Sequence, residues 1–141
     1  MNRQKAVTAA ALLLAAVMQT SRAGATETAS CTALDGSDVT VEINIGFAAV
    51  ETPVWIRIGD GDLLWSSLAA DQADDPNVVP VVIAQSFIDP DEMKIDVSDE
   101  NSEAIVASIR IARVEENDEY FQFGHIHLPG RSVHPLTCDG A

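Results

Sequence analysis

The residues best suited to chemistry in this sequence are three histidines that fall within ten positions near the carboxyl end of the chain. They stand as His125-Ile126-His127 and His134. Residues two apart on a β-strand point to the same face, so His125 and His127 can share a ligand. Two or three imidazoles are a common ligand set for zinc and copper. One hypothesis is therefore a zinc or copper site formed by His125, His127 and His134.

The turn that precedes His134 decides whether it joins the other two histidines. In a hairpin closed by a two- or four-residue loop, His134 lies opposite His125 or His127, whereas a three-residue loop places it on the other face. The alternative interpretation, which ranks ahead of the metal site, is three neutral imidazoles hydrogen-bonded to backbone at the edge of the core. It rests on the apolar residues expected on the same face, which are Phe121, Phe123, Leu136 and Cys138.

Familiar catalytic and nucleotide-binding motifs are incomplete in this chain. Gly130-Arg131-Ser132-Val133-His134 has histidine in place of the second glycine of a nucleophile elbow, and it is typical of a hairpin turn rather than a strand-to-helix turn. Gly59-Asp60-Gly61 lacks the remaining glycine of a dinucleotide fingerprint, and the chain has no P-loop lysine. The acidic segments 60–62 and 89–92 lack an EF-hand ligand series and fit tight turns. No nucleotide cofactor is expected, and an enzyme is the third-ranked hypothesis.

The two cysteines, Cys31 and Cys138, lie near opposite ends of the chain beyond residue 25. In an exported protein the default state of such a pair is a disulfide. A metal-thiolate pair or a redox couple is the alternative, but the Cys-x-x-Cys spacing is absent. The bond predicts that the first and last strands are neighbours.

The first 25 residues have the pattern of a cleavable secretory signal. Arg3 and Lys5 precede an apolar run over 6–18, and Ser21-Arg22-Ala23 or Ala23-Gly24-Ala25 supplies the small residues of a cleavage site. The apolar run is shorter than the roughly 20 residues that span a bilayer. We therefore predict no membrane anchor after cleavage, a periplasmic or secreted destination, and a single β domain over 26–141 behind a frayed leader that ends near Cys31.

Cleavage leaves a strongly acidic protein. Eight basic residues less the three in the signal leave five against 22 acidic residues, a formal net charge of −17. Such a surface repels nucleic acid and anionic lipid and attracts cationic partners and divalent metals. The interpretation that ranks first is a solvated surface whose charge keeps the protein soluble.

Period-two alternation of apolar residues must position all of these side chains. It predicts strands over 38–47, 53–58, 63–65, 93–97 and 121–128, and a final hairpin that continues through Pro129-Gly130-Arg131 into 132–138. The apolar run 81–87 predicts a strand buried on both faces, and 66–77 predicts a surface loop that can include one helical turn. Segment 103–114 fits both a helix and a strand, and its β-branched residues favour the strand. We predict an all-β fold, a small antiparallel sandwich or barrel of about seven or eight short strands with its terminal strands joined by the disulfide.

In size, compartment and charge the mature chain resembles the periplasmic lysozyme inhibitors, whose target is cationic. Their Ser-Gly-x-x-Tyr loop is absent, since the one tyrosine is Tyr120 in Glu119-Tyr120-Phe121. The first-ranked functional hypothesis is a non-catalytic binding module for a cationic protein or peptide, and the second is a periplasmic metal-binding protein that uses the His hairpin.

Overall fold

The structure, a computed structural model, describes residues 26–140, which form a closed all-β barrel with one short helix. The prediction of an all-β fold, a sandwich or a barrel, is confirmed, and the fold is the barrel; the described residues form nine strands rather than seven or eight, and one pair of them is parallel. The predicted signal, residues 1–25, lies outside the described residues. The elements are β1 (Thr26–Ala33), β2 (Thr40–Phe47), β3 (Glu51–Asp60), β4 (Leu63–Ser66), α1 (Ala69–Asp74), β5 (Val79–Ile88), β6 (Glu92–Asp99), β7 (Ile105–Glu116), β8 (Glu119–Leu128) and β9 (Ser132–Asp139).

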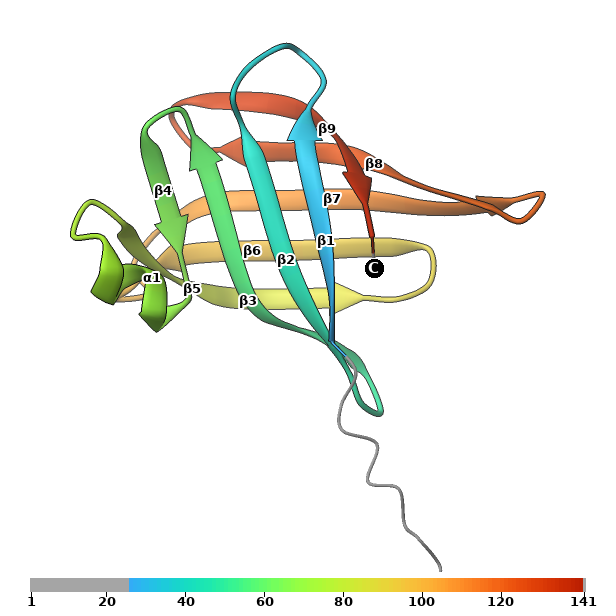
Figure 1. Cartoon of the computed structure of the whole chain (residues 1–141), viewed down its shortest axis with the longest axis horizontal. Coiled ribbons are helices and arrows are strands. Elements are labelled where there is room, and N and C mark those ends of the chain that lie inside the picture. Colours follow the sequence, from blue (N-terminus) through green and yellow to red (C-terminus); the bar gives the residue numbers. More distant parts are fainter. Residues whose placement is uncertain (1–25, 141) are drawn as a thin grey trace, which may run out of the picture.

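The strands follow one another around the barrel in chain order, and β9 returns to pair with β1 (Figure 1). The group β1 to β4 crosses β5 to β8 at a steep angle, so the barrel is flattened into two layers. Every neighbouring pair is antiparallel except β4 and β5, which meet in parallel only at Trp65 with Val79 and Ser66 with Pro80. A parallel pair needs a crossover connection, which the segment with α1 supplies. The expected helical turn between 66 and 77 is therefore confirmed.

Strand β5 corrects one sequence-based expectation. Its apolar run was expected to be buried on both faces, yet residues 84–87 are exposed. The reason is topological, since β4 pairs with β5 only at Val79 and Pro80 and leaves the rest of β5 paired with β6 alone. Phe87 is half exposed, and its ring lies 5.7 Å from Lys94 Nζ.

Two other segments are strands. Segment 103–114, which fitted both helix and strand, contributes most of β7, so the preference for a strand is confirmed. The segment before Cys31 is not a frayed leader, because β1 pairs with β2 from Thr26 opposite Gly46 to Thr32 opposite Thr40. Only Ala29 and Cys31 of β1 enter the core, so its apolar signal was too weak to predict a strand.

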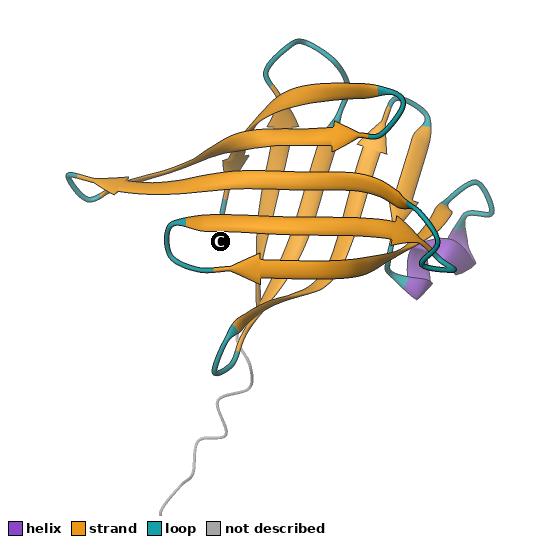
Figure 2. Ribbon diagram, turned by 180° about the vertical axis from the view of Figure 1, so that it is seen from behind, coloured by secondary structure: helices purple, strands orange, loops and turns teal. Residues whose placement is uncertain are grey.

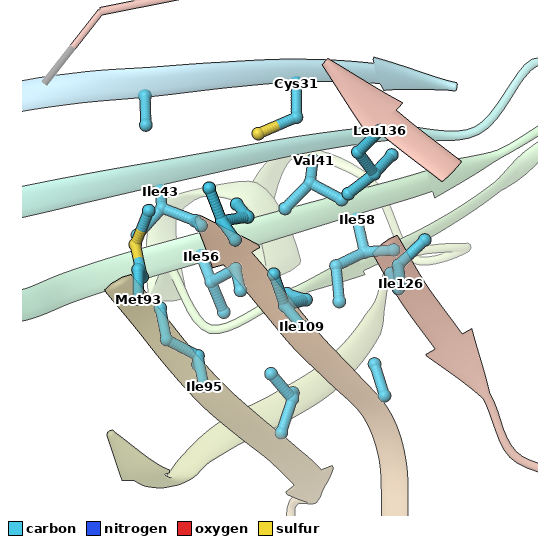
Figure 3. Packing of buried hydrophobic residues seen from close by; sticks show 14 of the residues in the cluster. Cys31, Val41, Ile43, Ile56, Ile58, Met93, Ile95, Ile109, Ile126 and Leu136 are labelled. Carbon is cyan, nitrogen blue, oxygen red and sulfur yellow. The ribbon is translucent and has the colours of Figure 1, made fainter. Parts of the chain in front are cut away.

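Alternate residues of the strands fill the barrel with aliphatic side chains (Figure 3). Fully burying one such side chain stabilises the fold by about 1.5–3 kcal/mol. In the close-up, isoleucines from β2, β3, β6, β7 and β8 meet in the interior, with Met93 beside them. The buried residues labelled there are Cys31, Val41, Ile43, Ile56, Ile58, Met93, Ile95, Ile109, Ile126 and Leu136.

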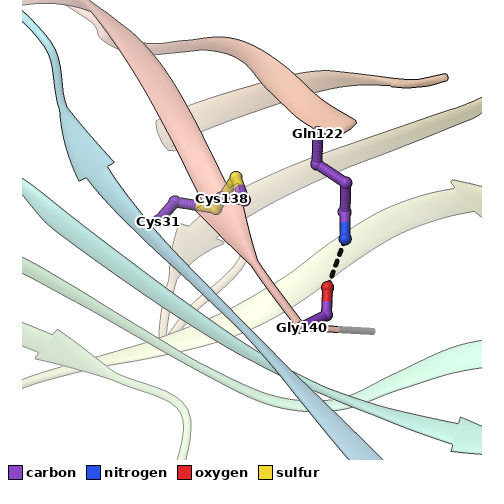
Figure 4. Close-up of a disulfide and its surroundings, with 4 residues drawn as sticks. All are labelled: Cys31, Gln122, Cys138 and Gly140. Carbon is purple, nitrogen blue, oxygen red and sulfur yellow. Dashed lines mark hydrogen bonds between the residues drawn. A yellow bond between two sulfur atoms is a disulfide. The ribbon is translucent and has the colours of Figure 1, made fainter. Parts of the chain in front are cut away.

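A disulfide between Cys31 and Cys138 joins the first and last strands, as predicted (Figure 4). The two residues are direct partners in the β1–β9 ladder, so the bond lies across the closing seam of the barrel. Beside it, Gln122 Nε2 of β8 donates a hydrogen bond to the Gly140 carbonyl. A disulfide such as Cys31–Cys138 is typical of a protein that folds in an oxidising compartment.

The only helix within residues 26–140 is the short α1, and none there is long and apolar enough to cross a membrane.

Candidate functional site

The three histidines do not converge. The turn Pro129-Gly130-Arg131 is a three-residue loop, because Leu128 pairs with Ser132. His134 therefore lies opposite Ile126, on the inward side of β9, whereas His125 and His127 are exposed on the outer side of β8. This is the case in which loop length sends His134 to the other face.

The three histidines therefore do not form the shared ligand set on which the zinc or copper hypothesis rested. Across residues 26–140, no group of three or more His, Cys, Asp or Glu side chains lies close enough together to hold a metal ion. The expectation that Phe121 and Phe123 share a buried face with the histidines is also wrong, since they are 50% and 51% exposed. Leu136 and Cys138 do face the core, on the side of β9 that carries His134.

His134 instead forms the centre of a hydrogen-bonded chain at one end of the barrel. Its Nδ1 lies 2.7 Å from Asp35 Oδ2, and its Nε2 lies 2.7 Å from Ser132 Oγ. Ser132 and His134 are two residues apart on β9 and so share a face. Asp35 comes from the loop between β1 and β2, where the Leu34 amide donates to the Pro135 carbonyl at 2.9 Å. The imidazole is 14% exposed.

Asp35 is held as a carboxylate. Ser37 donates to its Oδ1 from both the hydroxyl, at 2.7 Å, and the backbone amide, at 3.0 Å. These two bonds, followed by the bond from His134, lower the pKa of Asp35 from 3.8 to about 2. A carboxylate only accepts, so the hydrogen-bond network assigns the proton of neutral His134 to Nδ1 and leaves Nε2 as the acceptor for the Ser132 hydroxyl.

Sequence reasoning found His134 but missed Asp35 and Ser132 as its partners. In the sequence, Ser132 stands out only through a partial match of residues 130–134 to a nucleophile elbow, a motif that the start of a β-strand does not fit. Asp35 is 99 positions from His134 in the chain, and no local pattern joins the two. The usable signal was indirect: Ser-x-His on one strand, together with a disulfide that brings the first strand beside the last.

A second feature is a hairpin arm, defined as residues 112–123, whose outer part, residues 113–121 of β7 and β8, extends beyond the ladders with β6 and β9 (Figures 1 and 2). Its turn is Asn117-Asp118, and both residues have positive φ, 54° and 64°. Glu116 and Glu119 stand directly opposite each other beside the turn. Four exposed carboxylates thus crowd the tip, those of Glu115, Glu116, Asp118 and Glu119.

The outer face of the arm is apolar behind its acidic tip. Val114 and Phe121 are cross-strand partners, and Phe123 follows on the same face of β8. All three side chains are at least 39% exposed. On the opposite face lies Tyr120, whose pKa is raised chiefly by burial; Arg113 lowers it, and the surrounding carboxylates raise it further.

The base of the arm is fixed by Arg113, whose side chain is only 3% exposed. Its Nη1 donates to Glu51 Oε2 at 2.8 Å and to the Asp89 carbonyl at 2.9 Å, and its amide donates to the Asp91 carbonyl. These bonds tie the arm to β3 and to the β5–β6 turn. The arm therefore leaves the barrel from a braced position.

The five basic residues between positions 26 and 140 are already engaged. Each of the five forms an ion pair with a carboxylate of the barrel, and none of the four tip carboxylates takes part in these pairs within residues 26–140. The pairs are Arg57 with Asp71 and Glu42, Lys94 with Glu92, Arg110 with Asp96, Arg113 with Glu51, and Arg131 with Asp60.

Comparison of this chain with protein-family models, with curated proteins and with solved structures found no match.

Proposed function

We propose that this protein is an exported binding module whose hairpin arm docks a cationic protein or peptide in the periplasm or the extracellular medium. The observation that carries the proposal is the arm itself, which combines four exposed tip carboxylates with an exposed apolar face. The disulfide and the amino-terminal signal pattern support the compartment.

Charge complementarity selects the partner. The mature net charge is −17, and the five basic residues are all paired with carboxylates elsewhere on the barrel. The field at the tip therefore attracts cations and accelerates their encounter at low salt. A partner rich in lysine or arginine would supply the cations that the tip carboxylates lack.

The tip carboxylates are not explained by the stability of the hairpin. Glu116 and Glu119 are direct cross-strand partners, and like charges in that position destabilise a sheet. A cation between them would relieve this repulsion. Relief of the repulsion between Glu116 and Glu119, which is present in the free protein, thus favours binding of a cation.

The apolar face defines the partner further. Exposed apolar residues that cluster beside polar ones are typical of interaction sites. Phe121 and Phe123 offer aromatic faces to aliphatic side chains and to Lys or Arg through cation–π contacts. The partner that fits both features is amphipathic, with basic residues next to apolar ones.

Fluorescence anisotropy with a labelled peptide of alternating lysine and leucine tests the proposal. We expect binding at about 20 mM salt that weakens strongly at about 300 mM, because the Debye length shortens. The double substitution Glu116→Gln with Glu119→Gln should weaken binding by about two- to thirtyfold, since it removes two exposed ion pairs that each contribute about 0.2–1 kcal/mol. Phe121→Ser should weaken it at both salt concentrations.

The matched control is Glu100→Gln with Glu103→Gln, which removes the same charge from the β6–β7 turn at the other end of β7. This variant should bind as the wild type does. Equal weakening by both double variants would show that the overall charge attracts the peptide and would contradict a site on the arm. Equal affinity for a glutamate–leucine peptide would contradict a cationic partner.

A further inference from the structure

We propose that Ser132, His134 and Asp35 form a catalytic triad that hydrolyses carboxylic esters, at the end of β8 opposite to the arm. The evidence is the continuous chain from Ser132 Oγ to His134 Nε2 and from His134 Nδ1 to Asp35 Oδ2, with both distances 2.7 Å. A nucleophile within hydrogen-bond reach of a base that a third group orients is the arrangement needed for nucleophilic catalysis.

The series of hydrogen bonds assigns one role to each residue of the triad. Ser132 supplies the nucleophilic oxygen, and neutral His134 accepts its proton at Nε2. Asp35 fixes the tautomer and stabilises the imidazolium that forms when the proton arrives. Ser37 is a positioning residue, because its two bonds to Asp35 hold the carboxylate in place and its Oγ also lies 3.1 Å from His134 Nδ1.

A purely structural role could explain the Asp35–His134 hydrogen bond but not the Ser132–His134 hydrogen bond. The bond between Asp35 and His134 joins the β1–β2 loop to β9, and a backbone bond from Leu34 to Pro135 already makes the same connection. The bond between Ser132 and His134 joins two residues of one strand, so it adds no link between elements. Its geometry serves a nucleophile and its base.

The reaction needs no group beyond ester and water. Ser132 Oγ bonds to the carbonyl carbon as its proton passes to His134 Nε2 and the π electrons move to the carbonyl oxygen. When the carbonyl re-forms, the bond to the alcohol oxygen breaks, and the leaving oxygen takes the proton from Nε2. Water then loses a proton to Nε2 and attacks the acyl carbon, and Ser132 leaves with its proton restored. The products are a carboxylic acid and an alcohol.

The surroundings define the class of ester. Asp35 lies in the triad, Asp60 is the last residue of β3, and Asp62 lies in the turn to β4. Arg131 joins this end of β3 to the β8–β9 turn through its 2.8 Å ion pair with Asp60. The Arg131 guanidinium carbon also lies 5.4 Å from the centre of the Trp65 ring. Asp35, Asp60 and Asp62 outnumber Arg131 at this end of the barrel, so the local field favours neutral or cationic esters over anionic ones.

The experiment uses the disulfide-bonded mature protein with p-nitrophenyl acetate. Intact mass and peptide mapping follow acetylation, and absorbance follows release of nitrophenol. We expect an acetyl group on Ser132 and a matching release of nitrophenol. General-base assistance contributes about 10²- to 10⁴-fold, so Ser132→Ala and His134→Gln should lower the rate by at least about tenfold. Asp35→Asn should lower it as well.

The control is Ser86→Ala, which removes an exposed hydroxyl from β5, and this variant should react as the wild type does. Circular dichroism establishes that each variant is folded, and peptide mapping of the wild type gives an answer even where a variant does not fold. Acetylation confined to lysine and the amino terminus, or equal rates for the wild type and Ser132→Ala, would overturn the triad. Faster reaction of a negatively charged ester would overturn the substrate class. None of these three results bears on peptide binding by the arm.

Discussion

Contacts with neighbouring segments determine the ionisation of Asp35 and the need for glycine at position 124. Asp35 accepts hydrogen bonds from Ser37 and His134, and these bonds stabilise its charged form. Gly124 lies where β8 approaches β7 closely, and a Cβ at this position would stand 1.9 Å from the Arg110 carbonyl oxygen. For Gly124 the neighbouring strand sets the limit, whereas the Asp35 carboxylate is stabilised mainly by Ser37, two positions along the chain, and then by the distant His134.

The depressed pKa of Asp35, about 2 against 3.8, links its ionisation to folding. A group whose pKa is lower in the folded state stabilises the fold above its unfolded pKa, and the stabilisation is lost as pH falls through the folded value. The contribution of Asp35 should therefore be present above about pH 4 and fade toward about pH 2. NMR titration of the carboxyl carbon checks this, and Ser37→Ala should raise the pKa. Titration near 3.8 in the wild type would contradict the hydrogen bonds described here.

Gly124→Ala should destabilise the barrel severely, because the new methyl group meets backbone rather than a movable side chain. Overpacking costs about 1–3 kcal/mol when the surroundings can adjust, and we expect a loss at or above the upper limit. Gly46→Ala is the control, since its Cβ would meet the tip of Val54 at 3.2 Å. Urea denaturation compares the two variants. A smaller loss for Gly124→Ala than for Gly46→Ala would show that β7 and β8 separate easily.

At the scale of elements, the arm has an unfavourable turn. A two-residue hairpin turn with positive φ at both positions prefers Asn-Gly, whereas this chain has Asn117-Asp118. The residues beside the turn, Glu116 and Glu119, repel each other. Its base is nevertheless braced through Arg113. The arm thus combines a rigid attachment with a tip that is not optimised for stability.

Asp118→Gly should stabilise the arm by about 0.5–1 kcal/mol, because glycine adopts positive φ without steric cost and the substitution also removes one of four crowded charges. Thermal unfolding and amide hydrogen exchange in the arm measure the gain. Asn101→Gly, in the β6–β7 turn, is the comparison, since Asn101 has no positive φ to relieve. Equal stabilisation by both substitutions would show that the turn conformation of the arm is not the cause.

At the scale of the whole molecule, the disulfide secures the pairing of β1 with β9. This ladder spans only four residue pairs, from Ser30 with Asp139 to Ala33 with Leu136. The loop that the bond closes spans 107 positions. Closing so long a loop lowers the entropy of the unfolded chain more than closing a short one.

Replacing Cys31 and Cys138 together by alanine should lower the free energy of unfolding by up to about 4–5 kcal/mol, as chain entropy predicts for a loop of this length. The β1–β9 ladder should become the first part of the barrel to exchange its amides. Urea denaturation of the variant, and of the wild type with and without reductant, measures the loss. An unchanged midpoint after complete reduction would contradict a structural role for the bond.

The sequence by itself determined the features that depend on local pattern. Alternation predicted the strands that contain Ile43, Ile56, Ile95 and Ile126, because a residue's face on a strand follows from its position alone. The two cysteines predicted that the chain ends meet, because two thiols in an oxidising compartment have one bond to form.

Only the tertiary structure decided which side chains meet. A three-residue turn separated His134 from His125 and His127, since a shift of one residue in register reverses a face. The limited pairing of β4 exposed much of β5, whose composition had indicated burial. Asp35 reaches His134 because the barrel closes β1 onto β9, and no local pattern encodes a contact across 99 positions. Strand patterns are local in the sequence, whereas register and barrel closure depend on the whole chain.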